Sequence, residues 1–583
     1  MRFRNSIVLA LLSVSCVRAA SVSQTADIRT YLNAISIPGA NSEAFVPPDN
    51  SDIATWRRAV DALLTAQYAQ AATIADPLGY DVVKVTDSGR AKAYYVLRER
   101  SATSRGLGTY IYNPSACRMI SLHVPHASAD ANTKPEAIAL FAELNAVTLL
   151  IAGTHRCANA DASACDGNTT ACGAFGKFRI SDVAHYTQNF FEPAHEQVIK
   201  NIPGVISVAI HGEGATRSPD VLISNGTCTT PAGQSLPALL AAQFNRIFTD
   251  AGGTLKAGTC NSPGGSTELC AEVDVQGRYA NGSASLCNCQ SPAPSACSTT
   301  LGCVRAVSFP EKFIHVEQDC AVRQLAGCDA PASIGYQTAI DAFAAVFPCI
   351  PKINAVVQGA SFRVEPLAPG SFFSIFGDGM GTIDQSGSTA AFSLGGVKVQ
   401  TCGTPSRLFY NSGAGQLNGV VPVSAAGKTQ CDVVVSADGG FPLPSGSSAY
   451  PVQITPQNIA LFPYAVSSTL TAPIITNAAY QLIGPDGSGY VRAKKNSVII
   501  LWATGLGLTT PLVPDSQVAP GTLAPAVITP SIKIGDAAVT PAYSGLAPGF
   551  IGLYQINVQV PAGAASGKVP LMVNTAQYDL WVE

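Results

Sequence analysis

The histidines of this sequence are concentrated in one part of the chain. All seven lie between His123 and His315. Most of them belong to four polar groups that follow short apolar runs: His123 to Asp130, Thr154-His155-Arg156, His211 to Gly214, and His315-Val316-Glu317. The apolar runs are predicted strands, and open α/β sheets build their sites where strands end. The sequence therefore predicts that these four groups converge into one cluster.

Hydrolysis on zinc is the chemistry that suits such a cluster. Catalytic zinc takes three protein ligands from His and Asp/Glu and keeps a fourth position open. The metal acidifies water, and a nearby carboxylate takes the proton. We therefore predict one zinc ion held by His126, Asp130 and His211, with His123 as an alternative first ligand and Glu317 as the catalytic base.

A substrate would be held by residues close to these ligands. The planar guanidinium of Arg156 suits a substrate carboxylate, and His155 and His185 are predicted to assist in substrate binding. Asp182 and His185 form a further group that the sequence does not rank. Alternatively, these histidines have no functional role. On the predicted helix, His185 would then lie on the solvent-exposed face and His195 would pack in the interior.

The order of these residues is similar to that of the zinc carboxypeptidase and N-formylglutamate amidohydrolase superfamily. The resemblance covers about Tyr80 to Phe347 and implies hydrolysis of an amide or peptide bond beside a carboxylate. Two features depart from the family pattern. Three residues separate His126 from Asp130 where carboxypeptidases have two, and His211 lacks the Asp that often precedes this ligand by two positions.

The sequence also allows other functions. A serine hydrolase would show a Gly-x-Ser-x-Gly elbow, which the sequence lacks, and Gly212-Glu213-Gly214 lacks the third glycine of a phosphate-binding loop. Glu317 could instead pair with Arg323. A non-catalytic cell-surface or adhesion protein with a degenerate hydrolase-like domain is the main alternative, and a phosphate or sugar substrate is not excluded.

The elements that must position these residues alternate along the first part of the chain. Helical apolar spacing predicts helices over Ala54–Ala72, Lys134–Asn145, Asp182–Lys200, Leu236–Thr249 and Tyr336–Phe347. Short apolar runs predict strands over Tyr80–Val85, Ala93–Arg98, Thr109–Tyr112, Met119–Val124, Val147–Ala152, Val205–Ile210, Val221–Ser224 and Phe313–Val316. This alternation is typical of an α/β domain with a mostly parallel or mixed sheet and helices on both faces.

After Cys349 the sequence changes character and repeats itself. The matching segments are Gly370–Phe376 with Asn496–Trp502, Val397–Val399 with Ile532–Ile534, and Gly415–Pro422 with Tyr554–Pro561. Because the matches keep their order, one unit has been duplicated. Alternating short strands with Gly/Pro turns predict that each copy is an immunoglobulin-like β-sandwich.

This tail resembles the C-terminal domain shared by many acidobacterial secreted proteins. The resemblance rests on Leu546–Pro561 and Ala503–Gly507, and it covers about Ala355 to Glu583. It implies an extracellular accessory module that contacts a cell surface or matrix, and it implies no reaction.

The start of the sequence predicts export. Arg2 and Arg4 precede a short apolar run, Ile7 to Val14, and small residues favour cleavage after Ala19. Cys16 as a lipid-anchored cysteine is the less favoured alternative. The predicted domains are a signal peptide (1–19), a disulfide-rich hydrolase-like domain (20–350) and two β-sandwich units (351–460 and 461–583).

Cysteine content and charge agree with a secreted or cell-surface protein. Sixteen of the 17 cysteines follow Cys16, and they are expected to form disulfides whose pairing the sequence leaves open. Only 13% of residues are charged, the net charge is −3, and no basic cluster is present, so a nucleic-acid partner is not expected. No later apolar run is long enough for a transmembrane helix. The expected partner is a small-molecule or peptide substrate.

Overall fold

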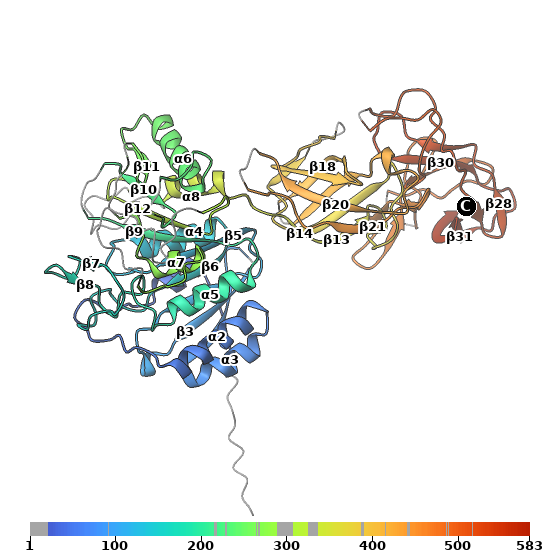
Figure 1. Cartoon of the computed structure of the whole chain (residues 1–583). Helices are drawn as coiled ribbons and strands as arrows, with labels where there is room; N and C mark the ends of the chain where they lie inside the picture. Colours follow the sequence, from blue (N-terminus) through green and yellow to red (C-terminus); the bar gives the residue numbers. More distant parts are fainter. Residues whose placement is uncertain are drawn as a thin grey trace, which may run out of the picture. The chain divides into compact units, whose positions relative to one another are not determined.

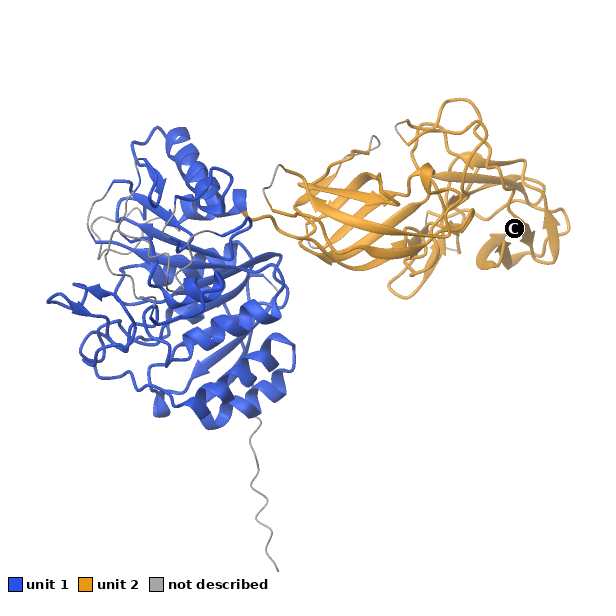
Figure 2. Cartoon of the chain, viewed as in Figure 1, with its two compact units in different colours: residues 1–346 blue, residues 347–583 orange. Residues whose placement is uncertain are grey.

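The protein forms two compact units, residues 1–346 and residues 347–583 (Figure 2). The computed structural model describes residues 21–583 apart from 91, 215–217, 228–229, 264, 266–268, 289–306, 324–335, 386–389, 414, 440–442, 486, 488 and 516. The predicted signal peptide, residues 1–19, lies outside the described residues.

The first unit is built on a mixed ten-stranded sheet with the order β1-β2-β3-β4-β6-β5-β9-β12-β10-β11. Its strands are β1 (Ser21–Ala26), β2 (Tyr80–Asp87), β3 (Ala93–Glu99), β4 (Thr109–Tyr112), β5 (Arg118–Val124), β6 (Ala146–Ile151), β9 (Ile206–Gly212), β10 (Val221–Ser224), β11 (Ala257–Thr259) and β12 (Phe313–Gln318). The four neighbours β6, β5, β9 and β12 are parallel, so their carboxyl ends lie at one edge. A small hairpin, β7 (Asn168–Thr169) and β8 (Gly176–Lys177), stands outside this sheet.

Helices cover both faces of the sheet, as the sequence predicts (Figure 1). They are α1 (Ile28–Asn33), α2 (Asn50–Leu64), α3 (Tyr68–Ala75), α4 (Thr133–Glu143), α5 (Phe191–Asn201), α6 (Leu236–Asp250), α7 (Val275–Ala280) and α8 (Gln337–Val346). Ser207 of β9 contacts His195 of α5, whereas Gln318 of β12 donates a hydrogen bond to Glu136 of α4. Gln318 pairs with Gly212 of β9, five residues after Ser207, so α4 and α5 lie on opposite faces.

Two of the predicted helices differ from the structure. The helix predicted over 54–72 is divided into α2 and α3 at Thr65–Gln67, where Ala66 has a positive φ of 61°. The helix predicted from Asp182 begins only at Phe191, so Asp182 lies in the preceding loop.

The loop before α5 is fixed by tertiary contacts rather than by helical hydrogen bonds. Phe190 stacks on Trp56 of α2 with ring centroids 4.5 Å apart, and its carbonyl accepts a hydrogen bond from the indole Nε1. The Asn189 side chain accepts a hydrogen bond from the Glu192 N–H in the first turn of α5. Apolar residues at helical spacing are therefore packed here within a loop. This is why the predicted start of the helix at Asp182 is wrong.

The second unit consists of two antiparallel two-sheet sandwiches, in agreement with the predicted duplication. In the first copy, the sheet β13-β14-β19-β18-β15 faces the sheet β17-β16-β20-β21 across one apolar core. In the second copy, β22-β26-β30-β29 and β28-β27-β31-β32 enclose another core. The repeated segments form equivalent pairs: β14 with β19 in one copy, and β26 with β30 in the other.

The strands of the first sandwich are β13 (Lys352–Gln358), β14 (Phe372–Asp378), β15 (Ile383–Gln385), β16 (Val397–Thr401), β17 (Thr404–Pro405), β18 (Arg407–Ser412), β19 (Gln416–Val420), β20 (Gln430–Ala437) and β21 (Tyr450–Gln453). Those of the second are β22 (Ala460–Leu461), β23 (Pro463–Ala465), β24 (Thr471–Pro473), β25 (Ile475–Asn477), β26 (Val498–Thr504), β27 (Ile532–Ile534), β28 (Ala537–Val539), β29 (Tyr543–Leu546), β30 (Tyr554–Gln559), β31 (Gly567–Val573) and β32 (Ala576–Val582).

Disulfides occur in both units, as expected from the cysteine content. The described pairs include Cys157–Cys172, Cys165–Cys287, Cys260–Cys270 and Cys402–Cys431. Across the described part of the chain, no helix is both long and apolar enough to span a membrane.

Candidate metal centre

The carboxyl ends of the four parallel strands bring distant polar residues together. On β9 and β12, the parallel register places Ala209 beside His315 and His211 beside Glu317. Since side chains alternate along a strand, His211, His315 and Glu317 share one face of the sheet. His126 follows the end of β5 by two residues and comes to the same face, with its ring centroid 4.6 Å from that of His211.

Asp130 is the centre of the first group of side chains. Its Oδ2 lies 3.2 Å from His126 Nδ1 and 3.1 Å from His211 Nδ1. The Gly212 N–H also points at this oxygen, at 3.4 Å. Donor atoms of His126, Asp130 and His211 all lie within 4.8 Å of one another, a spacing that a single metal ion can bridge. The structure therefore brings the three predicted ligands together.

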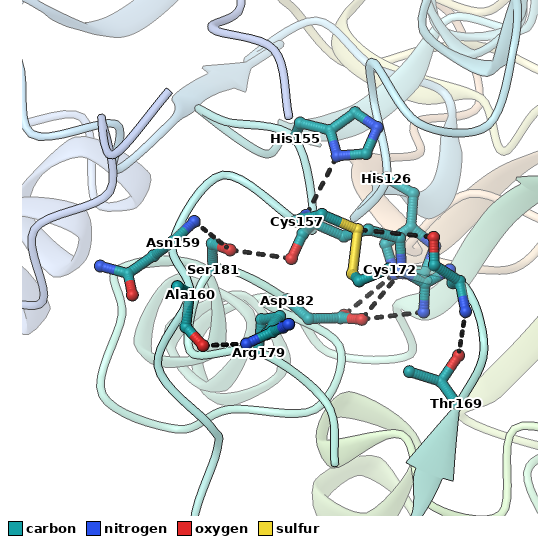
Figure 3. Close-up of a disulfide and its surroundings, with 12 residues drawn as sticks. His126, His155, Cys157, Asn159, Ala160, Thr169, Cys172, Arg179, Ser181 and Asp182 are labelled. Atoms are coloured by element: carbon teal, nitrogen blue, oxygen red, sulfur yellow. Dashed lines mark hydrogen bonds and ion pairs between the residues drawn. A yellow bond between two sulfur atoms is a disulfide. The ribbon is translucent and has the colours of Figure 1, made fainter. Parts of the chain in front are cut away.

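Asp182 lies behind His126 on the side away from Asp130. Its Oδ1 is 3.0 Å from His126 Nε2, and Figure 3 shows its carboxylate directed at that ring. Arg156 places Nε 3.0 Å and Nη2 2.8 Å from Asp182 Oδ2. A carboxylate on the second nitrogen of a histidine fixes the ring and its tautomer, and this arrangement is typical of metal-binding histidines.

The loop that carries Asp182 is tied to the loop that carries Arg156. The buried Ser181 hydroxyl donates to the Arg156 carbonyl at 2.8 Å and accepts from the Asn159 N–H. The Cys157–Cys172 disulfide follows Arg156 directly, and Figure 3 draws His126 and Asp182 among the surroundings of this disulfide. Covalent and hydrogen-bonded links thus fix the position of the carboxylate behind His126.

A second group adjoins the first through His211. The ring centroids of His211 and His315 are 4.5 Å apart, and His315 Nε2 lies 3.6 Å from Glu317 Oε2. Donor atoms of His211, His315 and Glu317 again lie within 4.8 Å of one another. His211 therefore belongs to both groups, since its ring lies next to His126 and Asp130 and also next to His315.

Burial and neighbouring charges shift the pKa values of these groups. Burial and Arg156 lower the pKa of His126, but Asp182 and Asp130 outweigh them and raise it to about 9. Burial acts in the opposite sense on Asp130, yet His126 and His211 hold its pKa well below the usual range. Burial, with Asp130, raises the pKa of Glu317 to about 8. Asp130 and Asp182 thus favour a positive charge at His126.

The donor set also passes a chemical test for zinc. Two imidazole nitrogens and one carboxylate oxygen are ligands that zinc accepts in catalytic sites. In the part of the chain that the structure describes, His211 Nε2 is buried without a hydrogen-bond partner, which is uncommon for a buried polar atom. The residues present therefore fit a resident metal ion.

The remaining predicted site residues lie at different places around this centre. His155 is partly buried, and its Nδ1 accepts a hydrogen bond from the Cys157 N–H. His123, the alternative ligand, is buried against Phe191 and His195 and belongs to neither ligand group of the described residues. His195 is buried in the interior, in agreement with the predicted packing role.

The solvated position expected for His185 is wrong. Its ring stacks on Phe178 with centroids 3.6 Å apart, and its Nδ1 lies 3.2 Å from the Val273 carbonyl oxygen. Burial lowers the pKa of His185 to about 3. The residue lies in the loop before α5 rather than on the exposed face of a helix, and its ring is 6.5 Å from that of His126. His185 therefore lies close to one of the predicted metal ligands.

The sequence assigns no role to two residues that lie close to the predicted ligands. Asp182 belongs to a group that the sequence does not rank, and His315 is a polar residue at a strand end. His315 had a usable signal, since it precedes Glu317 by two residues and must share its face of the strand. Asp182 had none, because 56 residues separate it from His126.

Comparisons with known proteins assign no family. No family model and no curated protein matches the chain. Among solved structures, the full extracellular region of plexin A4 matches at 11% identity over 40% of this chain, with a TM-score of 0.16, and this chain covers 18% of it. N-formylglutamate amidohydrolase from Ralstonia eutropha JMP134 matches at 14% identity over 41% of this chain and 94% of its own, with a TM-score of 0.22.

Proposed function

We propose that this protein is a secreted zinc-dependent hydrolase that cleaves an amide or peptide bond near a carboxylate. The observation that carries the proposal is the contact of one carboxylate oxygen of the partly buried Asp130, Oδ2, with Nδ1 of both His126 and His211. Asp182 on the far nitrogen of His126 supports it, because that carboxylate would orient the ring toward the ion.

Each residue has a defined part in the proposed reaction. His126, Asp130 and His211 would hold the ion, which supplies Lewis acidity to water and to the scissile carbonyl. Glu317, on the same face as His211, takes the proton from water and passes it to the leaving amine.

Arg156, His155 and His185 would bind the substrate. Arg156 keeps a positive charge beside the centre and would attract a substrate carboxylate, although Asp182 already occupies two of its donors. His155 and His185 would contact the rest of the substrate. The order of these residues in the sequence supports an amide substrate.

Export is part of the proposal. The disulfides of both units favour an oxidising compartment, which agrees with cleavage of a signal peptide after Ala19. The tandem sandwiches would then act as an accessory module that contacts a cell surface or extracellular matrix, as in the acidobacterial secreted proteins that the tail resembles.

Metal content of the full-length oxidised protein tests the proposal. After dialysis against an equimolar amount of zinc, we expect about one zinc ion per chain. His126→Ala and Asp130→Asn should lose the ion, whereas the control His155→Gln should keep it. A wild-type protein without metal after zinc is added back would sink the catalytic model and leave a non-catalytic surface protein.

Activity on N-acyl amino acids and short peptides tests the reaction itself. Glu317→Gln should keep the metal and lower kcat about 100-fold or more, the size expected for loss of a general base. Wild-type turnover by Glu317→Gln would show that another group is the base. Zinc binding without turnover of any amide would limit the proposal to a metal site.

A further inference from the structure

The second ligand group has the features of a metal site in its own right. His211, His315 and Glu317 come from adjacent parallel strands, β9 and β12, whose register places all three on one face. Their donor atoms lie within 4.8 Å of one another, and the two histidines are each 5% exposed. The group therefore sits on rigid elements, where ligand positions are well defined.

Among the described residues, two ring nitrogens in this group lack a hydrogen-bond partner. His211 uses Nδ1 for Asp130, and its Nε2 is buried without a hydrogen bond. His315 has Nε2 near Glu317, and its Nδ1 is likewise buried and unpaired. Unpaired buried polar atoms are costly, and a bound ion is one of the ways in which such atoms are satisfied.

We infer that His211 Nε2, His315 and Glu317 form a second, weaker site for a divalent transition-metal ion next to the zinc site. Histidine nitrogens with one carboxylate oxygen suit zinc, copper or nickel and disfavour calcium and magnesium. His211 would bridge the two ions through its two nitrogens. The inference goes beyond the proposed function, which needs only the ion at Asp130.

The second ion is expected to bind more weakly than the first for two reasons. With Nδ1 on the first ion, the His211 ring must release its last N–H proton before Nε2 can bind the second. The two cations also repel each other across one imidazole ring. Occupancy of the second site should therefore require zinc in excess of one equivalent.

The second ion has a functional consequence. It takes up the Glu317 carboxylate, which the proposed reaction needs as its base. Excess zinc should therefore inhibit the enzyme, and removal of His315 should relieve that inhibition while leaving the first ion in place.

Zinc titration of the apo full-length protein by calorimetry, with equilibrium dialysis to count ions, tests the inference. We expect two binding events in wild type, and only the tighter one in His315→Gln and His315→Ala. Asp130→Asn should lose the tighter event and keep the weaker one. Melting curves and far-UV circular dichroism check that each variant is folded, and the conservative His315→Gln is the variant to interpret if His315→Ala unfolds.

Each result separates this inference from the proposed function. One tight ion in wild type with no second event overturns the second site and leaves the proposed function intact. Two events in His315→Gln also overturn it. A single ion that is lost in His315→Gln but retained in Asp130→Asn supports this site and overturns the proposed function.

Inhibition gives an independent readout. Saturating excess zinc should lower the kcat/KM of wild type about 100-fold or more, as expected when a general base is withdrawn. His315→Gln should lose this inhibition but keep its activity at one equivalent of zinc. Equal inhibition of the two proteins would overturn the role assigned to His315.

Discussion

At the scale of single residues, His126 shows how a buried polar side chain is prepared for one task. Both of its ring nitrogens face carboxylates, Asp130 on one side and Asp182 on the other. Arg156 balances part of the charge of Asp182. A histidine fixed in this way cannot rotate freely, so its Nδ1 stays directed at the position where the ion would bind.

Loss of the carboxylate behind His126 should weaken metal binding without removing a ligand. Asp182→Asn is expected to lower zinc affinity about 10–100-fold, the usual effect of removing such a partner. Competition with a chromophoric chelator measures the change. The control Asp161→Asn, at an exposed position, should bind zinc as wild type does. Unchanged affinity of Asp182→Asn would show that the carboxylate does not orient the ligand.

A buried carboxyl group on α5 should make stability depend on pH. Burial raises the pKa of Glu192 well above its usual value, and Glu196 and Asp274 raise it further. As the pH rises above about 4.3, the unfolded chain ionises at this position before the folded protein does, so folding stability falls.

Glu192→Gln should therefore remove this pH dependence. We expect the variant to melt a few degrees above wild type at pH 8 and at the same temperature as wild type near pH 4. Melting curves at the two pH values measure the effect, with the exposed Glu43→Gln as a control. A variant that is less stable than wild type at pH 8 would contradict the assigned penalty.

At the scale of elements, the strand ends supply some of the site residues and the loops supply the others. His211 and Glu317 are fixed by the hydrogen-bonded register of β9 and β12. Asp182 depends instead on a loop held by the Ser181 hydroxyl and by the stacking of Phe190 on Trp56. The loop therefore needs several tertiary contacts to reach the precision that the sheet provides by itself.

Removal of the disulfide beside the centre should loosen this loop. The pair Cys157→Ala/Cys172→Ala opens a link between residues 15 positions apart and is expected to cost about 3 kcal/mol of stability. Because Cys157 follows Arg156, zinc affinity should fall as well. Chemical denaturation and zinc competition measure the two effects. The matched pair Cys402→Ala/Cys431→Ala, in the tail, should leave zinc affinity unchanged.

At the scale of the whole molecule, the candidate centre and the tandem sandwiches belong to separate compact units. All residues of both ligand groups lie within residues 1–346, and each sandwich has its own apolar core. A unit with its own core can in general fold alone.

The two units should therefore separate without loss of metal binding. We expect residues 21–351, produced with oxidised cysteines, to bind zinc as tightly as the full chain, and residues 352–583 to fold cooperatively without binding zinc. Metal analysis and melting curves of the two fragments test this expectation. Loss of zinc from the first fragment, if it is folded, would mean that the tail contributes to the site.

The sequence by itself determined those features that depend on local pattern. Strand-end polar groups such as His126 and His211 could be read from apolar runs, and the duplicated sandwiches from matching segments, because period-two and helical spacing are properties of neighbouring residues. The same signal failed at Asp182, since Val183, Tyr186 and Phe190 have helical spacing but lie in a loop. The spacing of apolar residues indicates which positions are buried, but it does not indicate which element packs against them.

Only the tertiary structure decided which distant residues meet. The position of Asp182 on His126, the pairing of His211 with Glu317, and the Cys165–Cys287 disulfide across 122 positions each depend on how whole elements pack. Such contacts depend on the sheet register and on the packing of the apolar core, which together decide where the ends of the strands lie. No local pattern in the sequence carries that information.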